Sequence, residues 1–229
     1  MKKVSIIQSN YIPWKGYFDI IAASDEFIIY DHVQFTKNDW RNRNKINTPT
    51  GTEWLSIPVG QNINQKIRDV KLSNHIWQKK HWKTLEGNYR RATYFDEIAS
   101  WLAPLYLNEM HLNLTEFNRL LICKICDYLG IKTKISYSWD YRLIEGRADN
   151  LIELCQQAGA TEYISGPTAK CYLEENCFSE SGIKLTWFNY DGYPEYPQLW
   201  GVFEHNVSIL DLLFNCGSNS HDFMKYVNK

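Results

Sequence analysis

The sequence predicts an α/β fold: a mostly parallel, Rossmann-like sheet with flanking helices and a helical insert. Three observations carry this prediction. Short apolar runs alternate with segments of helical periodicity along most of the chain. The first run, the helix after it and the second run form a β-loop-α-β unit of about thirty residues. A largely helical insert, from about residue 74 to 129, separates the early runs from the late ones.

Each element follows from local composition. Short β-rich runs bounded by turn residues predict strands over residues 4–7, 26–30, 54–59, 70–72, 135–139, 163–164 and 183–188. Helical spacing of apolar side chains predicts helices over residues 17–24, 74–89, 95–107, 115–129, 151–158, 170–175 and 207–215. We expect Thr115 to cap its helix and Gly130 to end it. The segment from Asp31 to Lys45 is interpreted as a loop.

Composition limits the classes of protein to consider. A chain of 229 residues without a linker or repeat predicts one domain over residues 1–229. The sequence does not predict the oligomeric state. Lys plus Arg number 25 and Asp plus Glu 26, so no basic field indicates a nucleic-acid partner or an anionic membrane. No apolar run reaches the ~20 residues of a membrane span. The short apolar run after Lys3 and six cysteines in apolar surroundings predict a cytoplasmic protein with reduced thiols.

Polar and aromatic residues gather where the first two apolar runs end. Because carboxyl ends of parallel strands meet at one edge of a sheet, this position predicts a ligand crevice. The first group consists of Gln8, Tyr11, Trp14, Gly16 and Tyr17. The second consists of Gln34, Lys37, Trp40, Arg41, Asn42, Arg43, Asn44 and Lys45. Guanidinium and ammonium groups bind phosphate, and amides suit sugar hydroxyls, so we predict substrate-binding residues here. The alternative is a solvated basic turn.

Two residues are candidates for proton transfer. Asp31 ends the second predicted strand, where a carboxylate can act as a base or bond a sugar hydroxyl; the alternative is a turn aspartate that caps local backbone. His81 titrates near neutral pH but lies between Trp77 and Leu85 on a helix, so a packed histidine is the alternative.

Two later segments are secondary candidates for the site. Ser165 and Gly166 form a turn that can offer backbone N–H groups to an anion, or that only joins a strand to a helix. Tyr196 and Gln198 lie in a proline-rich extended segment, either a lid over the site or a rigid connector. Cys123 and Cys126 form a CxxC pair in a predicted helix, but no second Cys or His pair follows at zinc spacing, so no metal site is predicted.

The chain resembles the WbqC-like protein family over nearly its whole length. The blocks that carry the resemblance are residues 8–18, 31–35, 40–44, 54–59, 80–83, 163–167, 196–199 and 208–215. The first unit also looks a little like that of HIGH-type nucleotidyltransferases, but Pro13 to Tyr17 stands where their histidine-rich turn would be.

The family resemblance implies an enzyme of bacterial O-antigen or surface-polysaccharide biosynthesis. It suggests transfer of an acyl or aminoacyl group to a nucleotide-linked amino deoxysugar. An acyl-CoA or an acyl-carrier protein is then the co-substrate, and no tightly bound cofactor is expected. Two alternatives stay open: a nucleotidyl- or glycosyltransferase of the same pathway, and a binding module without turnover.

Overall fold

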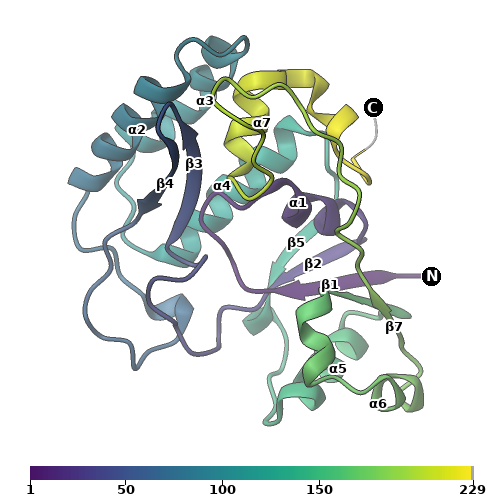
Figure 1. The fold of residues 1–229 in the computed structure, drawn as a ribbon. Coiled ribbons are helices and arrows are strands. Elements are labelled where there is room, and N and C mark those ends of the chain that lie inside the picture. The colour runs from purple at the N-terminus through teal and green to yellow at the C-terminus, as the bar shows by residue number, and fades with distance from the viewer. Residues whose placement is uncertain (228–229) are drawn as a thin grey trace.

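The computed structural model describes residues 1–227 and has an α/β architecture, which confirms the predicted fold class. Its centre is a five-stranded parallel sheet with the strand order β5-β2-β1-β6-β7 (Figure 1). The strands are β1 (Lys3–Ile7), β2 (Glu26–Ile29), β5 (Lys134–Tyr137), β6 (Glu162–Ser165) and β7 (Lys184–Trp187). The helices are α1 (Lys15–Ala22), α2 (Ile76–Tyr89), α3 (Phe95–Leu107), α4 (Leu114–Tyr128), α5 (Arg147–Gln157), α6 (Glu175–Glu180) and α7 (Ile209–Cys216).

The sheet separates two hydrophobic cores. On β2, Phe27 and Ile29 face the core formed with α1, α2, α3, α4 and α7, whereas Ile28 faces the core formed with α5 and α6. This alternation follows from the two-residue period of a strand. The strand is buried on both faces and reads as a continuous apolar run, as parallel strands do. In Figure 1, α5 and α6 lie below the sheet and α1, α4 and α7 above it.

The topology places a crevice at the carboxyl end of β1. The chain passes from β1 through α1 to β2 on one side, and β6 pairs with β1 on the other side. The strand order therefore reverses next to β1, and α1 and α5 cover opposite faces there. In open α/β sheets this reversal leaves room for a ligand at the strand ends.

An antiparallel hairpin lies outside the main sheet and corrects the sequence interpretation. The hairpin consists of β3 (Arg43–Thr48) and β4 (Gly51–Ser56). The prediction of a loop over residues 43–45 is wrong. Polar side chains hide the strand pattern, because Asn44 is buried where an apolar residue is expected. Gly51 has φ 108°, a conformation that permits the tight turn.

Smaller corrections concern caps and short elements. Asn113, not Thr115, caps α4, with its side chain accepting a hydrogen bond from the Glu116 N–H at 3.0 Å. The predicted helix over residues 170–175 is replaced by a 3-10 helix, Pro167–Cys171, followed by α6. The predicted strand over residues 70–72 forms only isolated bridges, Val59 with Leu72 and Lys71 with Asn113. Local spacing does not distinguish such short elements.

Candidate functional site

Residues 8–14, which we call the first loop, join β1 to α1 and are anchored on Asp31. The Asp31 carboxylate is fully buried and accepts hydrogen bonds from Ser9 N (2.8 Å), Ser9 Oγ (2.6 Å) and Thr115 Oγ1 (2.7 Å). Burial raises the pKa of Asp31, and these three donors oppose the rise. Asp31 thus ties the ends of β1 and β2 to α4.

The first loop contains a strained residue that Asn44 holds in place. Ile12 is buried with φ 36°, a conformation that β-branched residues rarely adopt. The Asn44 side-chain amide donates to the Tyr11 carbonyl at 3.1 Å and to the Ile12 carbonyl at 2.9 Å. Such strain persists only where the surroundings fix the backbone, and it gathers at ligand sites.

A second buried network lies beneath the same loop. The Tyr11 hydroxyl bonds His81 Nδ1 at 2.8 Å and Tyr106 at 2.7 Å, and His81 Nε2 bonds the Ser56 carbonyl at 3.2 Å. Since a carbonyl only accepts, we assign the proton to Nε2, and Nδ1 accepts from Tyr11. Burial lowers the pKa of His81 to about 4. Both ring nitrogens are engaged, which favours a packing role. Catalysis by Asp31 or His81 stays a prediction.

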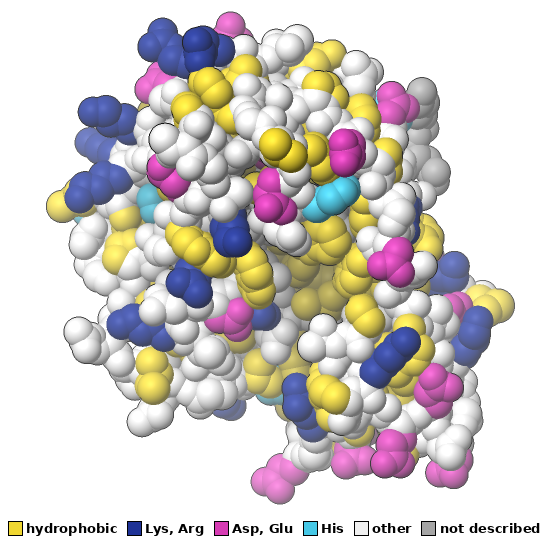
Figure 2. All heavy atoms as spheres, viewed as in Figure 1, with side chains coloured by type: hydrophobic (Ala, Val, Ile, Leu, Met, Phe, Trp, Pro, Cys, Tyr) yellow, Lys and Arg dark blue, Asp and Glu magenta, His cyan; other side chains and the backbone are white. Residues whose placement is uncertain are grey.

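Above the first loop lies a cavity of about 190 Å³, which we call the tryptophan cavity. Its walls are Asn10, Pro13, Trp14, Trp40, Asn44 and Asn206. Trp40 is 41 % exposed, and its ring lies 5.3 Å from that of Trp54. The Asn10 side-chain oxygen is buried without a hydrogen-bond partner among the described residues. Figure 2 shows this face hollowed between the elements above the sheet and those below it.

Cations border the Trp40–Trp54 pair. The Arg43 guanidinium carbon lies 4.2 Å from the centroid of the Trp54 ring, and Lys45 Nζ lies 5.3 Å from it. Neither cation forms an ion pair within residues 1–227, whereas Arg41 pairs with Asp39 at 3.3 Å. The ring pair that continues from the cavity wall at Trp40 to Trp54 therefore carries two cations without an ion pair, which suit a ring carrying phosphates.

Gly16 is required by the position of Trp14. A Cβ atom at Gly16 would lie 2.3 Å from the Trp14 ring. The Trp14 ring also packs against Tyr190, and the two ring centroids lie 5.2 Å apart. The ring of Trp14 is thus held between α1 and the segment after β7, as a rigid wall of the cavity.

Lys15 holds that segment in place and was not singled out from the sequence. Its ammonium is buried, donates to the Pro194 carbonyl at 2.9 Å, and lies 4.9 Å from the centroid of the Tyr196 ring. Burial lowers the pKa of Lys15 to about 8. Its place between two aromatic-rich segments is the only sequence signal that pointed to this role.

A second cavity, of about 480 Å³, opens at the strand ends on the α5 side of the first loop. We call it the strand-end cavity. Gln8, Tyr30, His32, Gln34, Gly146, Arg147, Asn150, Tyr163 and Tyr172 line it, with Ile6, Val33, Ile144 and Leu151. The Arg147 guanidinium lies 3.5 Å from the Tyr172 ring centroid. Sequence reasoning missed Arg147 and Tyr172, because they come from distant segments and match no motif.

His32 belongs to the polar wall of the strand-end cavity. Its Nδ1 bonds Ser138 Oγ at 2.8 Å, and the Asn150 amide donates to its Nε2 at 3.1 Å. Burial, helped by the charges of Lys66 and Arg68, lowers the pKa of His32 to about 4. The His32 ring is therefore neutral near pH 7.

The structure places some of the predicted site residues in the walls of the two cavities and the others outside them. Trp14, Trp40 and Asn44 line the tryptophan cavity, and Gln8 and Gln34 line the strand-end cavity. Other predicted residues support the backbone: Tyr17 donates to the Gln8 carbonyl at 3.0 Å, and Asn42 to the Ile57 carbonyl at 3.1 Å. Lys37 is exposed and lines neither cavity.

Tyr196 and Gln198 lie in a separate buried cluster. The Tyr196 hydroxyl and the Gln198 amide each donate to Asp211 at 2.9 Å, and Tyr89 donates to it at 2.8 Å. These bonds favour a rigid connector over a lid. Ser165 is buried at the end of β6, and the next residue, Gly166, approaches Tyr190.

No group of three or more His, Cys, Asp and Glu side chains within residues 1–227 gathers as metal ligands would. Over the same residues, no helix has the length and apolar character needed to cross a bilayer.

Comparison with known proteins gives two positive findings. The sequence model of the WbqC-like protein family matches residues 8–223. The chain is 56% identical over 228 residues to "Uncharacterized protein Rv1507c" of Mycobacterium tuberculosis, covering 99% of both chains. No solved structure matches.

Proposed function

The chain belongs to the WbqC-like protein family, and from its two cavities we propose that it transfers an acyl or aminoacyl group to a nucleotide-linked amino deoxysugar. The pathway we propose is the biosynthesis of a bacterial surface polysaccharide. One observation carries the proposal: the two cavities lie on either side of the first loop, with Gln8 in one wall and Asn10, two residues later, in the other. A transfer between two substrates needs two neighbouring sites.

The tryptophan cavity takes the amino sugar and part of its nucleotide. Trp14 and Trp40 stack on the sugar or base, as indoles do on flat or apolar ring faces. Arg43 and Lys45, which lie over the Trp54 ring next to Trp40, bind the diphosphate. The unpartnered oxygen of Asn10 accepts a hydrogen bond from a sugar hydroxyl or from the amine.

The chemistry is attack of the sugar amine on the acyl carbonyl. The amine nitrogen forms the new N–C bond, the activated donor's leaving group departs, and the amine gives up one proton. The cavity walls hold amides, indoles and a proline, and Asp31 and His81 are enclosed beneath the loop. The proposal therefore rests on positioning by the cavity walls, with the proton passing to water in the open cavity.

A mass-based assay tests the proposal. The protein is incubated with a panel of nucleotide-linked amino sugars and with acyl-CoA or acyl-carrier donors, and products are followed by mass spectrometry. We expect the sugar to gain the mass of one acyl group, and Arg43→Ala to reduce the rate. Tight binding of the nucleotide sugar without turnover would favour the binding module instead. A gain of a nucleotidyl or glycosyl mass would favour the other transferases.

A further inference from the structure

We propose that the strand-end cavity binds the nucleotide portion of the activated acyl donor; this rests on the transferase function proposed above. The cavity lies at the carboxyl ends of β1 and β2, next to Tyr163 of β6, where the strand order reverses. A ligand at that position is the general expectation for an open α/β sheet. Its volume of about 480 Å³ exceeds that of the tryptophan cavity, about 190 Å³. It falls within the range of pockets that hold small ligands and cofactors, roughly 300–1,000 Å³.

The lining indicates a flat ring and a phosphate. Arg147 lies over Tyr172 with 3.5 Å between its guanidinium carbon and the ring centroid, and it forms no ion pair within residues 1–227. Stacking fixes the guanidinium plane and leaves its N–H edge free for an anion. The rings of Tyr30 and His32 pack edge to face at 4.4 Å and form a second aromatic surface.

Charge limits the ligand further. Within residues 1–227, Arg147 is the only Lys, Arg, Asp or Glu side chain in the cavity wall. The carboxylate of Asp149 lies against Gly146, and Glu145 is exposed on the same segment. His32 is bonded to Asn150 and contributes no charge near pH 7. An aromatic base with a phosphate at the Arg147 edge fits this wall better than an apolar chain.

The position of Gln8 places this ligand next to the amino sugar. Gln8 is fixed from two sides, because its side chain accepts from Arg41 at 3.0 Å and its carbonyl accepts from Tyr17 at 3.0 Å. Asn10, in the wall of the tryptophan cavity, follows two residues later. A donor whose nucleotide occupies the strand-end cavity thus has only the first loop between it and the acceptor.

Calorimetric titration with two probes tests the inference. Adenosine 3′,5′-bisphosphate represents the nucleotide of a coenzyme A thioester, and AMP represents that of an acyl adenylate. We expect one of them to bind the wild-type chain, with a Kd below ~1 mM. Arg147→Ala and Tyr172→Leu should each weaken it by about 10-fold or more. The tighter probe identifies the kind of donor.

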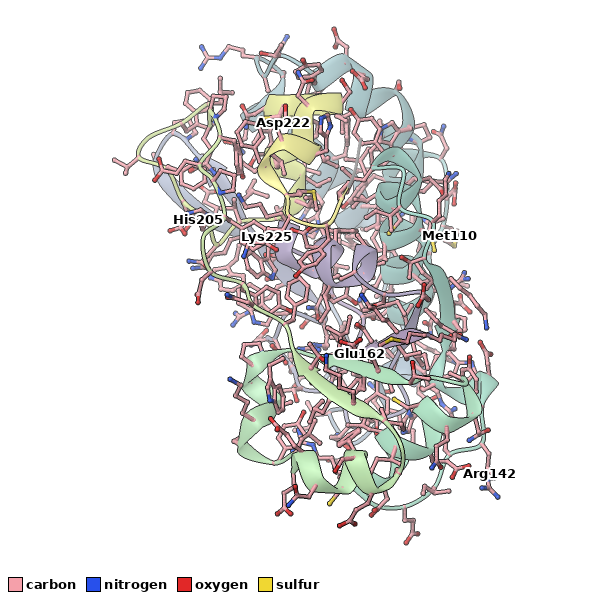
Figure 3. The ribbon with its side chains drawn as sticks, turned by 90° about the vertical axis from the view of Figure 1, so that its right-hand side faces the viewer. Met110, Arg142, Glu162, His205, Asp222 and Lys225 are labelled. Carbon is pink, nitrogen blue, oxygen red and sulfur yellow. The ribbon has the colours of Figure 1, made fainter. Side chains whose placement is uncertain are left out.

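Arg142→Ala is the matched control. Arg142 belongs to the same part of the molecule, is 73% exposed and pairs with Glu153 at 2.7 Å outside the cavity. Figure 3 shows Arg142 at the lower outer edge of the molecule. We expect Arg142→Ala to leave the Kd of either probe unchanged. Arg43→Ala should likewise leave it unchanged, which separates the strand-end cavity from the tryptophan cavity.

The outcomes separate this inference from the proposed function. If neither probe binds, or if Arg147→Ala binds as tightly as wild type, the inference is wrong even when acyl transfer is observed. If a probe binds and depends on Arg147 and Tyr172 but no donor is turned over, the nucleotide site stands, and its assignment to an acyl donor falls with the transferase function.

Discussion

The two sides of the first loop differ in how their polar groups are satisfied. On the underside, both carboxylate oxygens of Asp31 and both ring nitrogens of His81 form hydrogen bonds within the protein. On the upper side, the Asn10 side-chain oxygen has no partner within residues 1–227, and Trp40 is 41% exposed. The polar residues that follow β1 and β2 therefore serve two purposes. Asp31 and His81 hold the loop from beneath, and Asn10 and Trp40, which line the tryptophan cavity, are available to a ligand.

The largest expected effect comes from removing Asp31, which anchors the underside of the first loop. Asp31→Ala should lower the free energy of unfolding by about 3–5 kcal/mol, because it leaves several buried donors unpaired. Urea denaturation measures this. Asp69→Ala is the control, since Asp69 is exposed and pairs loosely with Arg68 at 3.8 Å; its loss should stay below ~1 kcal/mol. Similar losses for both variants would show that Asp31 does not anchor the loop.

The pH dependence of the free energy of unfolding tests whether His81 is buried and neutral. Its pKa is lowered from 6.5 to about 4 in the folded chain, so the unfolded chain binds a proton more readily as pH falls below 6.5. The folded state therefore loses stability as pH falls from 6.5 towards 4, by about 1.4 kcal/mol per pH unit at most, or about 2 kcal/mol near pH 5. Urea denaturation at each pH gives the slope.

His81→Asn is the variant for that series. Asn keeps an acceptor for Tyr11 but does not titrate, so the slope should flatten even if the variant is less stable at neutral pH. His32 has a lowered pKa as well and contributes with the same sign, so some slope persists. An unchanged slope in His81→Asn would contradict a neutral, buried His81.

On the upper side, Trp40→Ala should affect binding more than stability. Losing one stacking partner costs about 1–3 kcal/mol of binding free energy, or at least ~5-fold in Kd for the nucleotide-linked amino sugar. Trp40 is 41 % exposed, so the free energy of unfolding should change by less than ~1 kcal/mol. Trp139→Ala is the control, because Trp139 stacks on Tyr137 away from both cavities. Equal loss of affinity in both variants would contradict the assignment.

The smallest expected effects come from substituting two helical glycines, Gly87 and Gly16. Gly87 in α2 has nothing within 4 Å of an added Cβ, so Gly87→Ala should stabilise the chain by about 0.5–1 kcal/mol. In Gly16→Ala the added Cβ would lie 2.3 Å from the Trp14 ring, so the ring must move. We expect Gly16→Ala to destabilise by about 1 kcal/mol or more and to weaken ligand binding. Stabilisation by both substitutions would show that Trp14 is not held against α1.

Much of the fold follows from local patterns. The buried strands β1 and β2 and the helix between them are evident from apolar runs and helical spacing, and their parallel pairing brings the residues after each strand together. Tyr11 N does donate to the Trp40 carbonyl at 3.0 Å. The hairpin was not evident, because Asn44 and Asn47 occupy buried positions that normally signal a strand by being apolar.

The division of labour among the site residues could not be predicted. Asp31 and His81 have the chemistry of catalytic groups, and only their partners Ser9, Thr115 and Tyr11 reveal how they are bonded. Those contacts join residues far apart in the chain. For the same reason, the strand-end cavity depends on α5 and on Tyr172, whose approach to β1 is set by the whole topology.

One measurement tests the central claim most directly: the rate of acyl transfer to a nucleotide-linked amino sugar by the wild-type chain and by Trp40→Ala, under matched conditions. We predict an acylated product from the wild-type chain, and a kcat/KM at least ~5-fold lower in Trp40→Ala at unchanged thermal stability. Equal rates in both chains, or no acylated product with any donor, would contradict the account.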